Sequence, residues 1–154
     1  MAIVFSSPED RLTRQVKLGV HVNDMRGVLA FQGLYYVLTG VWPLISLRTF
    51  EAVTGPKTDD WLVQTVGVLA AVIGAALLVG SKREPPHLET LTLSVLSAVG
   101  FIAVDVVFVL RGTISSIYLV DAAAQAVLLG VLLVLLLTKH RSEVQSVKGA
   151  GRTN

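Results

Sequence analysis

Apolar residues are gathered into four runs of about twenty along this chain, rather than scattered at the spacing of a water-facing helix. The runs cover residues 27–47, 61–79, 91–110 and 117–138. Each is long enough to cross a hydrocarbon core of roughly 30 Å as an α-helix. The pattern predicts an all-α fold, a four-helix transmembrane bundle that occupies residues 27–138.

Polar segments flank these runs at both ends. Residues 1–26 carry acidic and basic side chains, so they lack the uninterrupted apolar core of a cleavable signal peptide. Leu12, Val16 and Val20 recur on one helical face, which predicts an interfacial amphipathic helix ending before a new helix cap at Asn23 or Asp24. A frayed leader that only supplies positive charge is the alternative. Residues 139–154 are predicted to be a disordered cytoplasmic tail.

The basic residues predict the orientation. Ten of the 13 lysines and arginines lie in the N-terminal segment, the second loop and the tail, and three lie in the first and third loops. Because positive charge is retained on the cytoplasmic side, this bias predicts that both termini are cytoplasmic, an N-in/C-in topology. The net charge of +2 adds little. The absence of cysteine excludes disulfides, thiolate metal sites and cysteine nucleophiles.

The first loop, residues 48–60, has a pattern of its own. Phe50 and Val53 precede a Gly55-Pro56 turn, and Trp61 follows at the expected membrane interface. This arrangement predicts a short amphipathic element that is ordered over the outer face, with Phe50 and Val53 as its buried contacts. Thr58, Asp59 or Asp60 is expected to cap the second span.

Two segments around this loop carry a resemblance. The run TGVWPL (39–44), followed by FEAVTGPKTDDWLVQTVG (50–67), resembles a family of small uncharacterised bacterial integral membrane proteins of about four helices, a domain of unknown function. The resemblance covers about thirty residues. It implies a multi-pass protein of the bacterial inner membrane, the cytoplasmic membrane, and it assigns no functional residue.

Helical geometry at 100° per residue predicts which face of each span points inward. The inward stripes are Gln32, Tyr36, Thr39 and Pro43 on the first span; Gln64, Gly67, Ala71 and Ala75 on the second; Ser94, Ala98, Phe101 and Asp105 on the third; and Asp121, Gln125 and Leu128 on the fourth. Leucine, valine and isoleucine dominate the other faces, which are expected to contact lipid.

Asp105 and Asp121 are the strongest functional clue, because a charge within a lipid-spanning helix costs a few kcal/mol unless it is compensated. Both are expected about one turn below the outer surface, facing each other or a shared pocket. The candidate ligand-binding residues are Asp105, Asp121, Gln125, Gln64, Tyr36 and Gln32. The inner half of the bundle carries few comparable groups.

Four interpretations of these aspartates remain open. In a structural one, they are held by Arg111, Arg48 or Lys57 reaching from the interface and by Gln64, Gln125 or Tyr36. In a second, they line a pocket for a cation, an amine or a small amphiphile. A third makes the chain a proton- or cation-coupled transporter or channel, with a homodimer as one way to complete its path. The fourth is an intramembrane enzyme that uses paired carboxylates.

We predict a small binding or accessory module with an acidic pocket in the outer half of the bundle, and the transporter or channel is the alternative. His21, His87 and His140 all fall on the cytoplasmic side, away from the aspartates, so neither a metal nor a cofactor is expected. No catalytic motif is present, so an enzyme is disfavoured. Membrane lipid is an expected partner, with a second membrane protein or a second copy as further candidates, and nucleic acid is not.

Overall fold

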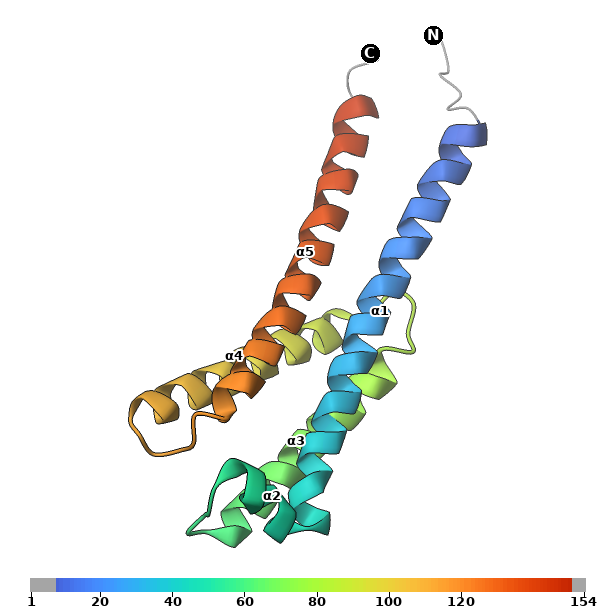
Figure 1. Cartoon of the computed structure of the whole chain (residues 1–154). Coiled ribbons are helices and arrows are strands. Elements are labelled where there is room, and N and C mark those ends of the chain that lie inside the picture. Colours follow the sequence, from blue (N-terminus) through green and yellow to red (C-terminus); the bar gives the residue numbers. More distant parts are fainter. Residues whose placement is uncertain (1–7, 151–154) are drawn as a thin grey trace.

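Five α-helices make up the described part of the chain (Figure 1). The structure is a computed structural model that describes the backbone of residues 8–150 and the side chains of residues 22–138. The helices are α1 (Pro8–Ile45), α2 (Leu47–Thr54), α3 (Asp60–Gly80), α4 (Leu88–Leu110) and α5 (Tyr118–Ala150). Within that part there is no β-strand, which confirms the all-α prediction.

Four of these helices contain segments that are long and apolar enough to cross a membrane. The segments are Val22–Ile45, Asp60–Gly80, Leu88–Leu110 and Tyr118–Thr138, and they match the four predicted spans closely. Only 17–33% of each segment is buried within the chain, so most of the apolar side chains point outward. Such an exposed apolar surface fits a multi-pass membrane protein, whose outward faces are solvated by lipid.

Two helices extend beyond the predicted boundaries. Helix α1 begins at Pro8 and passes through Asn23 and Asp24, so the predicted cap at those residues is wrong. Single glycines cost a helix only about 1 kcal/mol each, and no proline interrupts α1 before Pro43. Helix α5 continues to Ala150, so residues 139–150 are helical where a disordered tail is predicted. The predicted amphipathic face depends on the side chains of Leu12, Val16 and Val20, which lie outside the described side chains. Residues 151–154 of the predicted tail lie outside the described backbone.

Helices α1 and α3 form the closest pair, because glycines meet where they cross. A Cβ atom added at Gly33 would lie 2.7 Å from the Gly74 carbonyl oxygen, and one at Gly40 would collide with the Gly67 carbonyl oxygen. The reciprocal substitutions at Gly67 and Gly74 would meet the carbonyls of Gly40 and Gly33. Helices in lipid associate through this kind of close backbone packing. The four glycines therefore determine which helix lies beside α1.

These glycines also determine which face of α3 is buried. The buried residues are Gly67, Ala70, Gly74, Leu77 and Gly80. The predicted stripe is wrong at Gln64 and Ala75, which are exposed, whereas Gly67 is buried and Ala71 is half-buried. The buried face lies about a quarter-turn from the predicted one at 100° per residue. By contrast, the predicted inward stripes of α1, α4 and α5 are buried or half-buried throughout.

The predicted element after the first span is the short helix α2. Ser46 caps it by accepting a hydrogen bond from the Thr49 amide, and the Trp42 indole donates to Thr49 Oγ1 (2.9 Å). The rings of Trp42 and Phe50 pack edge to face with centroids 5.6 Å apart. Phe50 is thus a contact residue as predicted, whereas Val53 is 52% exposed and the prediction that it is buried is wrong.

The helices form an open bundle. In Figure 1, the start of α1 and the end of α5 lie at the same end of the molecule, and α2 lies at the other end. Helix α3 lies alongside α1, whereas α4 runs across the view and leads into α5. The pair α1–α3 and the pair α4–α5 meet where α4 and α5 contact the middle of α1, through the hydrogen bonds described below.

Candidate functional site

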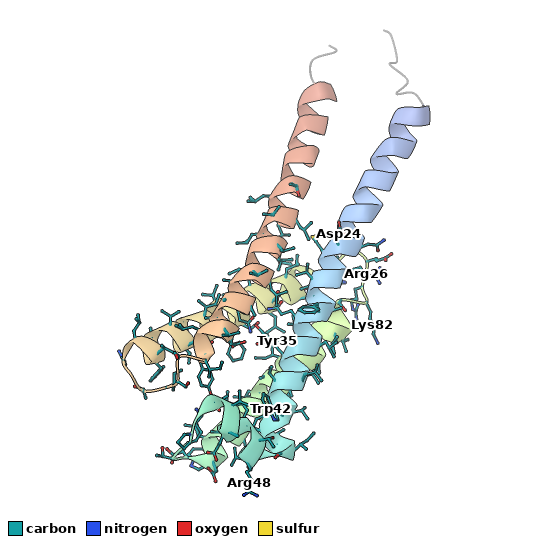
Figure 2. All side chains as sticks on the ribbon, in the orientation of Figure 1. Asp24, Arg26, Tyr35, Trp42, Arg48 and Lys82 are labelled. Atoms are coloured by element: carbon teal, nitrogen blue, oxygen red, sulfur yellow. The ribbon has the colours of Figure 1, made fainter. Side chains whose placement is uncertain are left out.

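A cluster of polar side chains from three helices lies at this meeting point. Its members are Gln32, Tyr35 and Tyr36 of α1, Ser94 and Asp105 of α4, and Asp121 and Gln125 of α5. Tyr35 marks its place between α1 and α5 in Figure 2. Because each helix presents the polar members of its inward stripe, the cluster forms where the three stripes converge.

The deeper half of the cluster is a fully satisfied hydrogen-bond network. Gln32 Nε2 donates to Tyr36 Oη and to the Ser94 carbonyl oxygen, both at 3.1 Å, and the Ser94 hydroxyl donates to Gln32 Oε1. The Tyr36 hydroxyl donates to Gln125 Oε1 (2.9 Å). All four side chains are at most 2% exposed. Four mutually paired side chains thus connect α1 to both α4 and α5.

The remainder of the cluster centres on an acidic pair. The carboxyl groups of Asp105 and Asp121 lie within interaction range of each other, as predicted. The Tyr35 hydroxyl donates to Asp121 Oδ1. Asp105 is 5% exposed, and its buried Oδ2 has no hydrogen-bond partner among the described residues. The pair therefore retains an unused acceptor on a buried side chain, which is costly.

Basic side chains do not neutralise this pair within the described residues. Lys57 donates to the Thr54 carbonyl oxygen (3.1 Å) and lies 4.9 Å from the Tyr118 ring centroid. Arg111 lies over the Phe108 ring. Of the described side chains, only Arg26 and Glu84 form an ion pair. The predicted compensation by Arg111, Arg48 or Lys57 is therefore wrong for this conformation.

Gln64 does not join the cluster, contrary to the sequence prediction. It is exposed on α3, because the glycine face of that helix turns toward α1 and carries Gln64 away. The other predicted site residues, Asp105, Asp121, Gln125, Tyr36 and Gln32, are brought together. Helix α3 supplies no polar side chain to the site.

Two members of the cluster are absent from the predicted set. Ser94 lies on the same predicted inward stripe as Asp105, so the sequence predicts that it faces inward. It does not predict a role in the site, because a lone serine in a span usually bonds to its own helix. Tyr35 neighbours Tyr36, and only the placement of α5 beside α1 reveals that its hydroxyl reaches Asp121. Phe101 completes the wall, since its ring packs edge to face on Tyr36 with centroids 5.2 Å apart.

The polar cluster extends further along the helices than the sequence suggests, and it ends at Gln32. Asp121 lies about 4.5 Å inside the start of α5, whereas Ser94 lies about 9 Å from the opposite end of its span, at 1.5 Å per residue. The cluster thus crosses the middle of the bundle. Beyond Gln32, the fully buried side chains of Leu29 and Leu77 pack with Tyr36 in the apolar core. These leucines separate the cluster from the end of the molecule where α1 begins.

The donor set limits what this site can bind. Two carboxylates and a phenol attract a cation, but among the described side chains no group of three histidines or acidic residues gathers to hold a metal ion. Comparisons with protein-family models, with curated proteins and with solved structures find no match to this chain. The resemblance of residues 39–67 to a family of bacterial membrane proteins therefore stays a prediction.

Proposed function

We propose that this protein is a small binding or accessory module of the bacterial cytoplasmic membrane, whose acidic pair binds a cation in the outer half of the bundle. The observation that carries the proposal is the unpartnered Oδ2 atom of Asp105, buried beside Asp121. The buried Asp105 carboxylate and the half-buried Asp121 carboxylate repel each other when both are charged, and a bound cation removes both the repulsion and the unused acceptor.

The site favours a compact monovalent cation. Asp121 lies near the start of α5, so the ligand enters from the end of the bundle that carries α2. A proton, a small inorganic cation or a primary amine satisfies Asp105 Oδ2 without a large cavity. The rings of Tyr36 and Phe101 add an aromatic wall that suits an alkylammonium group.

A cation-coupled transporter is the second candidate, and one observation favours it. The bonds between Gln32 and Ser94 carry polar groups past the middle of the bundle. Leu29 and Leu77 close the route beyond them, so transport requires these side chains to move. Proton flux into liposomes containing the protein distinguishes a transporter from a closed binding module.

Asparagine substitutions in the acidic pair test the binding proposal. Asp105→Asn and Asp121→Asn each remove one charge while keeping a similar shape. We expect either variant to weaken cation binding roughly ten- to hundredfold, since a hydrogen bond to a charged group contributes about 1.5–3 kcal/mol. Calorimetric titration of the purified chain with sodium chloride and with ethylammonium chloride, and a titration of the carboxyl infrared bands with pH, measure the binding.

Asp24→Asn is the matched control, because Asp24 is an exposed carboxylate of α1 far from the acidic pair. It should bind like the unmodified chain. If none of the three titrations detects binding, or if Asp24→Asn weakens binding as much as Asp105→Asn, the acidic pair is not a cation site. Intact folding of all variants is checked by their thermal unfolding.

The proposal includes the N-in/C-in topology, which the bias of basic residues supports. Since the chain has no native cysteine, single cysteines placed at the exposed positions His87, Thr58 and Ser115 report it directly. We expect a membrane-impermeant thiol reagent applied to intact cells to label Thr58→Cys and Ser115→Cys but not His87→Cys. Labelling of His87→Cys alone would reverse the orientation and place the acidic pair in the inner half.

A further inference from the structure

Two grooves flank α1 at the end of the molecule opposite α2. One lies between α1 and α5, with a volume of about 590 Å³. The other lies between α1 and the end of α3, with a volume of about 470 Å³. Asn23 and Gly27 border both grooves, and a Cβ atom at Gly27 would meet nothing within 4 Å. Because Gly27 has no side chain, neither groove is filled at this position of α1.

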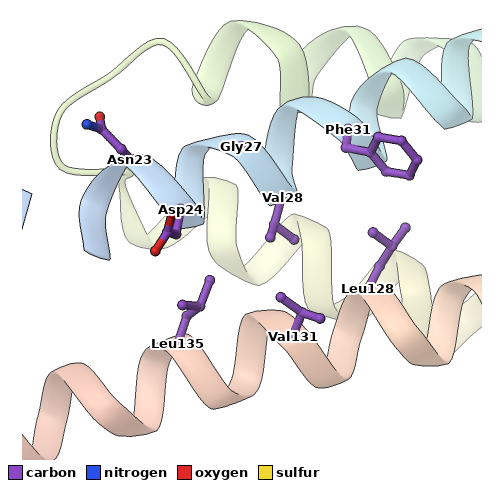
Figure 3. A pocket seen from close by; sticks show the side chains of 8 residues that line it. All are labelled: Asn23, Asp24, Gly27, Val28, Phe31, Leu128, Val131 and Leu135. Atoms are coloured by element: carbon purple, nitrogen blue, oxygen red, sulfur yellow. The ribbon is translucent and has the colours of Figure 1, made fainter. Parts of the chain in front are cut away.

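The two grooves carry opposite charges at their mouths. In Figure 3, Asp24 and Val28 of α1 point toward Leu135 and Val131 of α5, so the mouth beside α5 is acidic and its walls are apolar. The groove beside α3 is bordered instead by Arg26 and Lys82, which lie close together in Figure 2. An anion is therefore attracted to the groove beside α3 and repelled from the one beside α5.

The basic groove is built by contacts between α1 and the loop after α3. Arg26 Nε donates to the Ser81 carbonyl oxygen (2.9 Å), and its guanidinium also pairs with Glu84. These contacts hold Arg26 at the mouth. Lys82 also lines the groove and is exposed, and Arg83 follows it in the same exposed loop. Glu84 offsets one of the three cations, so the mouth keeps a positive charge.

The position of this groove matches the boundary between lipid headgroups and acyl chains. Arg26 lies four residues inside the first span, and Lys82 lies two residues beyond Gly80, where the second span ends. Deeper in the groove, the lining is Gly27, Ala30 and Leu78, which offers no polar side chain. A charged mouth above an apolar channel at this depth fits an amphiphile rather than a soluble anion.

We infer that this groove binds an anionic phospholipid, with its phosphate beside Lys82, Arg83 and Arg26 and one acyl chain along Gly27, Ala30 and Leu78. Basic pockets between membrane helices recognise lipid phosphates in this way. Arginine supplies a planar fork of donors for the phosphate, and lysine supplies a mobile point charge. This site is separate from the acidic pair and does not depend on its function.

Native mass spectrometry of the full chain in detergent, titrated with phosphatidylglycerol or phosphatidylcholine, tests the inference. The unmodified chain should bind phosphatidylglycerol more tightly. Lys82→Gln and Arg83→Gln should each weaken that binding about fivefold, and the double variant about twenty-fivefold, because each basic residue near an anionic headgroup contributes about 1 kcal/mol. Binding of phosphatidylcholine should stay unchanged.

Two further variants separate a groove from general charge attraction. Arg48→Gln removes an exposed charge at the opposite end of the molecule and should change phosphatidylglycerol binding less than twofold. Ala30→Phe fills the channel and should weaken binding with every charge retained. Equal affinities for the two lipids, an equal loss in Arg48→Gln, an unaffected Ala30→Phe, or free glycerol phosphate binding as tightly as the lipid would each overturn the inference.

Discussion

Replacing Gly74 with leucine is expected to separate α1 from α3 and to give the largest loss of stability in the chain. A side chain at Gly74 meets the Gly33 carbonyl oxygen and the backbone nitrogen of Val37, neither of which can move without displacing α1. Forcing extra atoms into packed helices costs about 1–3 kcal/mol, and more where backbone resists. Unfolding in detergent, followed by circular dichroism, measures the loss.

Gly130→Leu is the control for this experiment. Gly130 is also helical, and a Cβ atom there meets nothing within 4 Å. Both substitutions gain the same intrinsic helix propensity, about 1 kcal/mol, so the comparison isolates the packing effect. Equal stabilities of Gly74→Leu and Gly130→Leu would show that the glycine contact between α1 and α3 does not form.

The second large effect is expected at Gln32. Gln32→Leu removes two hydrogen bonds that join α1 to Ser94 of α4 and one bond to Tyr36 within α1, and it leaves their buried polar atoms short of partners. The expected destabilisation is about 1–3 kcal/mol, the cost of an unsatisfied buried group. Equilibrium unfolding in mixed micelles measures it.

The chain contains its own control for this change. Gln64→Leu makes the same substitution on the exposed face of α3, where no hydrogen bond is lost, so stability should change by no more than about 0.5 kcal/mol. A double-mutant cycle of Gln32→Leu with Ser94→Ala should give a coupling of about 0.6–1.7 kcal/mol, the range for such bonds between membrane helices. Zero coupling would contradict the Gln32–Ser94 contact.

These expectations divide the polar cluster into two parts with different roles. Gln32, Tyr36 and Gln125 satisfy one another, so their substitution should mainly change stability. Asp105 and Asp121 leave an acceptor unused, so their substitution should mainly change binding. The six candidate residues chosen from the sequence therefore do not form one uniform site. The amide and phenol groups of Gln32, Tyr36 and Gln125 form the hydrogen-bonded network beside the proposed cation site.

The sequence by itself determined the spans and three of the four inward faces. Runs of about twenty apolar residues have few alternatives to a membrane helix, and polar residues on such a helix must turn inward because lipid offers them no partner. Gln32, Tyr36, Asp105 and Gln125 are buried for this reason. The same argument failed for Gln64, since a strong backbone contact elsewhere on α3 outweighed the cost of exposing one amide.

Only the tertiary structure decided how the helices pair and where the acidic pair finds its neighbours. Gly33, Gly40, Gly67 and Gly74 are readable as small residues, but their contact depends on two helices crossing at a matching register, which local sequence does not encode. That pairing excludes α3 from the polar cluster and leaves α4 and α5 to complete it. It also brings the Tyr35 hydroxyl to Asp121, although the two residues are 86 positions apart in the sequence. Among the described residues, no basic side chain forms an ion pair with Asp105 or Asp121. The physical reason is that long cationic side chains keep their charged ends at the membrane surface, where water solvates them.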